Sequence, residues 1–177
     1  MEPEVYKTSS FGKFTDQSHW SLGALQQLMV SGELSSEELV RTSLSAISEG
    51  ADINAFITLR ESGAIDEAIA CDSQRARGET LGPLHGVPVA VKDNIQVAKL
   101  PTTGGTPALR ACISQRDASV VSRLKAAGAI VVGKTNMHEL AFGITSDNVA
   151  FGAVHNGRRH LSDSSFPAKI DILREID

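Results

Sequence analysis

An apolar segment that ends abruptly in two charges dominates this sequence. Residues 82–94 read GPLHGVPVAVKDN, with proline and glycine before a valine-rich run and Lys92 and Asp93 directly after it. Such a run predicts a buried strand whose C-terminal end presents a charged pair. Because open α/β sheets hold their ligand sites at the C-terminal ends of strands, we expect Lys92 to lie at a functional site.

The chemistry expected of Lys92 depends on how deeply its side chain is buried. It follows Val87, Val89 and Val91, so the sequence predicts surroundings of low dielectric constant. Such surroundings favour the neutral amine, which can act as a base near neutral pH. The alternative is a lysine whose stem covers the strand end while its ammonium stays in water, as most lysines do.

Several segments in register resemble one family. Residues 82–94 resemble the strand of the amidase signature family that carries its catalytic lysine. Residues 127–143, which read AGAIVVGKTNMHELAFG, resemble the next segment of that family, in the same order along the chain. Between them, residues 101–106 (PTTGGT) and Asp117 before a helix also match. The chain is therefore identified as similar to this family over residues from about 81 to 156.

The resemblance implies an α/β fold, namely the N-terminal part of the family's mixed-sheet α/β/α fold, with N-terminal helices. It also implies a hydrolase that cleaves carbon–nitrogen bonds of carboxamides. In the family, a lysine activates a serine nucleophile through a second serine, and a Gly/Ser-rich segment supplies both hydroxyls and the oxyanion hole. By resemblance, Lys92 is the base, and Thr103 and Met137 border the substrate pocket. For Thr103 the alternative is a plain turn, and for Met137 a core methionine.

The match to the family is lost after Asn156. Residues 157–177 stand where the family continues into its Gly/Ser-rich segment, and Ser164 and Ser165 lack the flanking glycines that let backbone approach an oxyanion. We transfer neither serine role to this pair. The expectation is a truncated amidase, inactive or weakly active, that arose through a frameshift, an early stop or a rearrangement. The alternative is a non-catalytic module that needs a partner, or that self-associates through an incomplete sheet.

Residues 136–148 narrow the resemblance within the family. Their sequence, NMHELAFGITSDN, is most similar to indoleacetamide hydrolase and to related arylacetamide amidases. The tRNA-dependent amidotransferase of the same family has a related block with different residues. His138 and Glu139 are expected to form a solvated or capping pair, and His85 and His155 are expected to be structural.

The remaining chain predicts helices and strands around this segment. Helical spacing covers residues 22–29 and ends at Gly32, and a capping box joins Ser35 to Glu38 at the start of a second helix. These two helices precede the first predicted strand.

Strands and helices then alternate. Residues 54–58 and 129–132 predict strands, residues 61–77 and 118–127 predict helices, and Asp117 is expected to cap the last of these. Alternation of this kind predicts a parallel or mixed sheet. We expect a loose leader over 1–19, an incomplete amidase-like α/β portion over 20–156 and an unmatched tail over 157–177.

Composition and charge argue against several other functions. The chain has 17 Lys and Arg against 21 Asp and Glu, a net charge of -4, so nothing favours nucleic acid. No apolar run reaches the roughly 20 residues of a membrane helix, and the N-terminus lacks the pattern of a secretory signal. Cys71 and Cys112 are not in C-x-x-C spacing, so a metal site is not expected. We expect a cytoplasmic protein that has no cofactor and whose partner, if it is active, is a small carboxamide.

A nucleotide-binding pattern is the rival motif. Residues 128–135 read GAIVVGKT and satisfy the P-loop expression G-x-x-x-x-G-K-[ST]. A P-loop follows a strand and wraps phosphate with flexible backbone, whereas this stretch follows a predicted helix and its apolar centre predicts a strand. Nucleotide binding is therefore the less favoured alternative.

Overall fold

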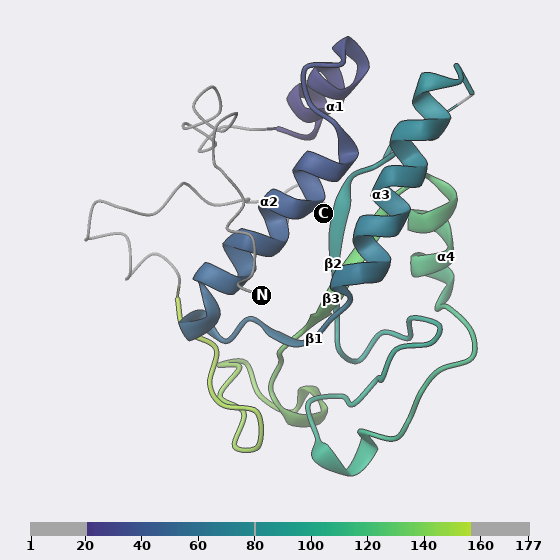
Figure 1. Ribbon diagram of the computed structural model, residues 1–177. Coiled ribbons are helices and arrows are strands. Elements are labelled where there is room, and N and C mark those ends of the chain that lie inside the picture. The colour runs from purple at the N-terminus through teal and green to yellow at the C-terminus, as the bar shows by residue number, and fades with distance from the viewer. Residues whose placement is uncertain (1–20, 80, 157–177) are drawn as a thin grey trace, which may run out of the picture.

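The computed structural model describes residues 21–79 and 81–156. In this part of the chain, a three-stranded sheet lies among four α-helices, as the α/β prediction requires (Figure 1). The predicted leader over 1–19 and tail over 157–177, with Ser164 and Ser165, lie outside the described residues.

The N-terminal helices form where the sequence predicts them. Helix α1 spans Leu22–Ser31, and helix α2 spans Ser36–Glu49. Gly32 ends α1 in the left-handed conformation, with φ of 77°, where a side chain would be strained. The predicted capping box is confirmed: the hydroxyl of Ser35 accepts from Glu38 N, and the Glu38 carboxylate accepts from Ser35 N at 2.9 Å.

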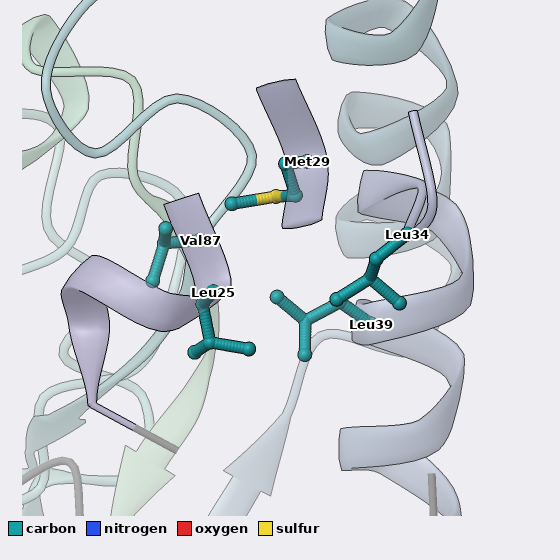
Figure 2. Packing of buried hydrophobic residues seen from close by; sticks show 5 residues of the cluster. All are labelled: Leu25, Met29, Leu34, Leu39 and Val87. Carbon is teal, nitrogen blue, oxygen red and sulfur yellow. The ribbon is translucent and has the colours of Figure 1, made fainter. Parts of the chain in front are cut away.

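A compact apolar cluster holds these helices against the segment that leads into the lysine strand. Figure 2 shows its five side chains converging from α1, from the turn after it, from α2 and from the residue before the strand: Leu25, Met29, Leu34, Leu39 and Val87. All are buried to within a few per cent of full burial. The helices therefore brace the start of the strand rather than its chemical end.

Removing the cap of α2 is expected to destabilise the fold. Ser35→Ala leaves an N–H donor at the helix start unpaired, which costs about 1 kcal/mol in the free energy of unfolding. Urea unfolding measures the loss. Ser45→Ala on the exposed side of the same helix is the matched control, and its free energy of unfolding should change by less than about 0.5 kcal/mol. Equal losses in the two variants would contradict the capping role.

Helix α3 (Glu61–Ala76) also supports the start of α2. Asp72 accepts from Ser36 N at 2.8 Å and from Glu37 N at 2.9 Å, and pairs with Arg75 at 2.7 Å. Burial alone would raise the pKa of Asp72, but these N–H donors and Arg75 bring that pKa below its usual value. The ionised carboxylate therefore stabilises the junction of α2 and α3.

The contribution of Asp72 should depend on pH. Its pKa in the folded state lies below the unfolded value of 3.8, so its stabilisation is present above 3.8 and is lost as the pH falls through the folded pKa. Asp72→Asn is expected to cost about 2 kcal/mol near neutral pH, and the gap to the unsubstituted chain should shrink in acid. Urea unfolding across this range measures it, with exposed Asp66→Asn as the control. A gap that is constant with pH would contradict the assignment.

The sheet is mixed, as predicted. Strands β1 (Phe56–Leu59), β2 (Pro88–Lys92) and β3 (Ile130–Thr135) are arranged in the order β1-β3-β2. The central β3 pairs antiparallel with β1 and parallel with β2. Strand β3 runs three residues beyond the predicted end, because the glycine, lysine and threonine after the apolar run still pair with β1 and β2.

Helices cover both faces of this sheet. On one face α2 and α3 enclose Val40, Ala64, Ala68, Ile130 and Val132. On the other, helix α4 (Ser119–Ala126) and the segment after β2 enclose Val91, Val97, Val121 and Val131. Short 3-10 helices lie at Ala51–Ile53, Pro107–Leu109 and Glu139–Ala141. Figure 1 shows the long connections after β2 and after β3 at the same end of the sheet.

An extra residue in β3 sets which side chains face which way. Val89 pairs with Val131 and Ala90 with Gly133, so Val132 has no counterpart on β2. Beyond this bulge Val91 lies opposite Lys134, and Lys92 opposite Thr135. Because residues paired across parallel strands share a face, Lys134 lies on the α4 face with Val91, and Lys92 lies on the opposite face with Thr135.

The predicted cap of the last helix is wrong. Ala118 is the N-cap of α4 and makes no side-chain capping bond. The Asp117 carboxylate instead accepts from Ala98 N at 2.7 Å and pairs with Lys125 at 3.0 Å. Burial would raise the pKa of Asp117, but these two partners lower it. The acid thus joins α4 to the loop after β2.

None of the helices in residues 21–79 and 81–156 combines the length and apolar character needed to cross a lipid bilayer.

Candidate active site

The chemical end of β2 opens into a cavity. Lys92 is the last residue of the strand, is exposed, and lines a cavity of about 490 Å³ together with its register partner Thr135. Ala90 lines the same cavity two residues earlier, which places one face of β2 along its floor. The strand therefore delivers one primary amine to a hollow at the C-terminal end of the sheet.

The other walls come from the segment after β3. Met137 and His138 follow the strand directly, and Ala141, Ile144 and Ser146 come from the loop beyond. Met137 is only 1% exposed, so it contributes a fixed apolar wall. The structure therefore brings together Lys92 and Met137, two of the three residues that the sequence marked.

Thr103 lies elsewhere. It is 2% exposed, is not among the residues that line this cavity, and directs its hydroxyl and its N–H at the Asp93 carboxylate. Its surroundings are the packed loop after β2. It touches the site through Asp93, the neighbour of Lys92.

The buried amine of this region is Lys134, not Lys92. Lys134 and Asp93 are both fully buried, and the Lys134 ammonium lies 3.2 Å from Asp93 Oδ1. Lys134 also donates to the Pro101 carbonyl at 3.0 Å and to Thr102 Oγ1 at 3.1 Å. Burial lowers the pKa of Lys134, against the attraction of Asp93. The low-dielectric setting that the sequence predicted for Lys92 is thus found one strand away.

Asp93 collects several contacts at one point. Its Oδ2 accepts from Thr103 N at 3.1 Å and from the Thr103 hydroxyl, and Gly104 N donates to its carbonyl at 3.1 Å. Its own N–H donates to the Thr135 carbonyl at 3.2 Å. Its Oδ1 makes no aligned hydrogen bond with the described residues, so Lys134 balances the charge on that oxygen.

The loop held by Asp93 is joined to the cavity wall. Asn148 Nδ2 donates to the Gly105 carbonyl at 2.7 Å and to the Met137 carbonyl at 2.8 Å. Gly105 has φ of 74°, and a Cβ there would lie 2.8 Å from Asn148 Nδ2 and 3.0 Å from the Met137 carbonyl. Glycine is required for this close crossing, which links the two long connections of Figure 1.

The histidines have different settings. His85 Nε2 lies 2.9 Å from the Cys71 carbonyl, which fits its expected structural role. The side chain of His138 makes no capping bond, and its buried Nδ1 has no hydrogen-bond partner among the described residues. His138 is therefore not the capping residue that we expected, and it presents a polar ring to the cavity instead.

The geometry of β3 argues against a phosphate site. Ile130–Thr135 is a paired strand and Lys134 is sealed within the sheet, so residues 128–135 cannot form the flexible loop of a P-loop. Among the residues that the structure describes, no group of three or more His, Cys, Asp or Glu side chains could hold a metal ion. The chemistry of the cavity is that of an amine beside mostly apolar walls.

Sequence reasoning missed the role of Asp93 and Lys134. The adjacency of Lys92 and Asp93 indicated a charged pair at the strand end, but not that the two would point to different surroundings. The bulge at Val132 that places Lys134 beside Val91 has no recognisable signal in the sequence.

Comparison with known proteins identifies the type of site. The family model described as Amidase matches residues 38–162. The chain is 43% identical over 143 residues to the A-type subunit of glutamyl-tRNA(Gln) amidotransferase from Salinispora tropica, covering 80% of this chain and 29% of that protein. It is 41% identical over 152 residues to mandelamide hydrolase of Pseudomonas putida, covering 84% and 30%.

A solved structure agrees. The native peptide amidase of Stenotrophomonas maltophilia superposes with a TM-score of 0.73 at 34% identity, over 80% of this chain and 31% of that one. The chain thus spans about 30% of the length of the relatives that it matches. With the lysine strand, the loop after it and the following strand all inside the matched region, the chain belongs to the amidase signature family.

Proposed function

We propose that this chain supplies the lysine-bearing part of an amidase that hydrolyses carboxamides. The position of Lys92 at the end of β2, exposed at the cavity, is the observation that carries the proposal. As base, Lys92 would accept the proton of a serine nucleophile, directly or through a second hydroxyl, and return it to the departing amine. The carboxamide acyl group would lie along the Met137 wall.

The walls favour an apolar acyl group. Ala90, Met137, Ala141 and Ile144 line the cavity, and a thioether with small aliphatic side chains suits a flat aromatic ring. His138 Nδ1 could exchange a hydrogen bond with a polar substituent on that group. We infer an arylacetamide substrate of the indoleacetamide type, which extends the sequence-based expectation.

Turnover needs a nucleophile that the described residues do not supply in the manner of the family. The only serine that lines this cavity is Ser146, in the described part of the chain, and its φ of 53° lies in the left-handed region. We propose that the 177-residue chain alone is inactive, as expected of a truncated amidase, and that its lysine functions once a Gly/Ser-rich segment is present.

A chimera tests this function. Residues 21–156 replace the matching segment of the Pseudomonas putida mandelamide hydrolase, and ammonia release is measured with indoleacetamide, mandelamide and acetamide. The expected result is hydrolysis, with higher kcat/KM for the two aryl substrates. A folded chimera without activity would contradict the function, and a preference for acetamide would contradict the acyl class. Ammonia release by the 177-residue chain alone, abolished by Ser146→Ala, would show that no further segment is needed.

A partner-dependent module is the second candidate, favoured by an exposed apolar loop. Phe142, Ile144 and Val149 are 88%, 101% and 96% exposed on the segment that also walls the cavity. Isolated apolar residues are common on surfaces, but three on one short loop favour association. Size-exclusion chromatography with light scattering, comparing the chain with Phe142→Ser/Val149→Ser, tests this. A monomer in both cases would exclude self-association. The cytoplasmic location stays a prediction, which cell fractionation would test.

A further inference from the structure

We propose that Asp93 and Lys134 are positioning residues whose buried ion pair fixes Lys92 relative to the Met137 wall. This inference rests on the proposed function in one respect, namely that Lys92 is the reacting amine. Neither residue lines the cavity, and both are fully buried, so they act through other residues.

The pair occupies the point where the lysine strand leaves the sheet. Asp93 follows Lys92 directly, and its N–H donates to the carbonyl of Thr135, which is the register partner of Lys92. The last pairing of β2 with β3 is therefore completed by Asp93. A shift of Asp93 would change the direction in which the Lys92 backbone leaves the strand.

The Asp93 side chain reaches the opposite wall through a chain of hydrogen bonds. Its Oδ2 accepts from Thr103, whose hydroxyl accepts from Gly105 N at 3.0 Å, and the Gly105 carbonyl and the Met137 carbonyl share Asn148 Nδ2. Leu140 N also donates to the Gly104 carbonyl at 2.7 Å. The loop after β2 and the loop after β3 are thus held to one carboxylate.

Lys134 completes this arrangement from the far side. Its three N–H donors have three oxygen partners, on Asp93, Pro101 and Thr102. A carboxylate sealed in the interior without a counterion would be strongly disfavoured, so Lys134 allows Asp93 to stay ionised where two loops meet. Fully satisfied buried networks of this type keep a unique geometry.

The test uses the 177-residue chain and needs no turnover. The ester p-nitrophenyl phenylacetate acylates a neutral lysine: the bond from Nζ to the acyl carbon forms, the ester C–O bond breaks, p-nitrophenolate leaves and the amine proton goes to solvent. Peptide mapping gives the rate at Lys92 relative to exposed Lys99 as a function of pH. This ratio reports the placement of Lys92, and the internal reference removes effects of overall reagent access.

Paired substitutions separate positioning from folding. Asp93→Ala/Lys134→Met removes the acceptor without leaving a buried charge, and should lower the Lys92 to Lys99 ratio about tenfold and shift its pH profile, since small displacements of reacting groups cost large rate factors. Asp93→Asn/Lys134→Met keeps an oxygen for Thr103 and should recover most of the ratio. Asp117→Asn, which breaks the partly exposed pair with Lys125, should leave it unchanged.

A milder pair covers the case in which the double variant does not fold. Thr103→Val removes one donor to Asp93, and Thr103→Ser restores it, so the ratio should fall in the first and recover in the second. Wild-type ratios in Thr103→Val, or in a folded Asp93→Ala/Lys134→Met chain, would overturn the proposal. Because acylation needs no serine nucleophile, these results are independent of whether the chimera hydrolyses amides.

Discussion

Replacing Lys92 with methionine is expected to lower kcat of the amidase chimera by about 10²- to 10⁴-fold, the range that general acid–base catalysis contributes. Methionine keeps most of the stem of the side chain and removes the proton acceptor at the end of β2. The KM for an arylacetamide should change little, because the acyl group is proposed to contact Met137 and Ile144 rather than the amine. Initial rates of ammonia release over a range of substrate concentrations separate the two parameters.

The control for this substitution is Lys99→Met. Lys99 is exposed on the loop after β2 and does not line the cavity, so the same chemical change there should leave kcat within about twofold. A Lys92→Met chimera that retains its kcat while folded would remove the lysine from the mechanism. Equal losses in both variants would point to a general effect of removing charge.

Breaking the buried ion pair should have the largest effect on stability. Asp93→Asn leaves the Lys134 ammonium buried without its counterion, and Lys134→Met does the same to the Asp93 carboxylate, so each single change should cost about 3–5 kcal/mol. The double variant Asp93→Asn/Lys134→Met should recover much of this loss, because no unpaired charge is left. Urea unfolding of the four proteins gives the coupling free energy as a double-mutant cycle.

The partly exposed pair is the comparison for that cycle. The side chains of Asp117 and Lys125 are 18% and 31% exposed, and their separation of 3.0 Å is shorter than that of the buried pair. Solvent screens this pair, so its coupling should be about 1 kcal/mol or less. If the two cycles gave the same coupling, burial of Asp93 and Lys134 would not be what makes their pairing important.

Local patterns predicted the elements well. The capping box at Ser35 and Glu38, the helix stop at Gly32 and the apolar run before Lys92 each depend on residues close together in the sequence, and each is confirmed. The mixed sheet followed from the alternation of helices and strands. Asp117 failed as a cap because a distant backbone N–H, that of Ala98, competes for the same carboxylate.

Long-range placement could not be predicted from the sequence. Lys92 and Met137 were marked through resemblance and share a cavity, but nothing local indicated that Thr103 would turn toward Asp93. The same holds for the two lysines: Lys92 follows the more apolar strand and is exposed, whereas Lys134 follows a glycine and is buried. Their settings depend on strand register, which is a property of two segments together.

The unmatched Val132 in β3 gives strand length a meaning of its own. Without that residue the alternation beyond Val131 would be inverted, so the sealed ammonium and the cavity-facing Thr135 would exchange sides. The cavity would then hold two cations next to each other, and Asp93 would be left facing a hydroxyl. Evolution could therefore vary the apolar residues of this strand with some freedom, while a one-residue insertion or deletion there would be excluded.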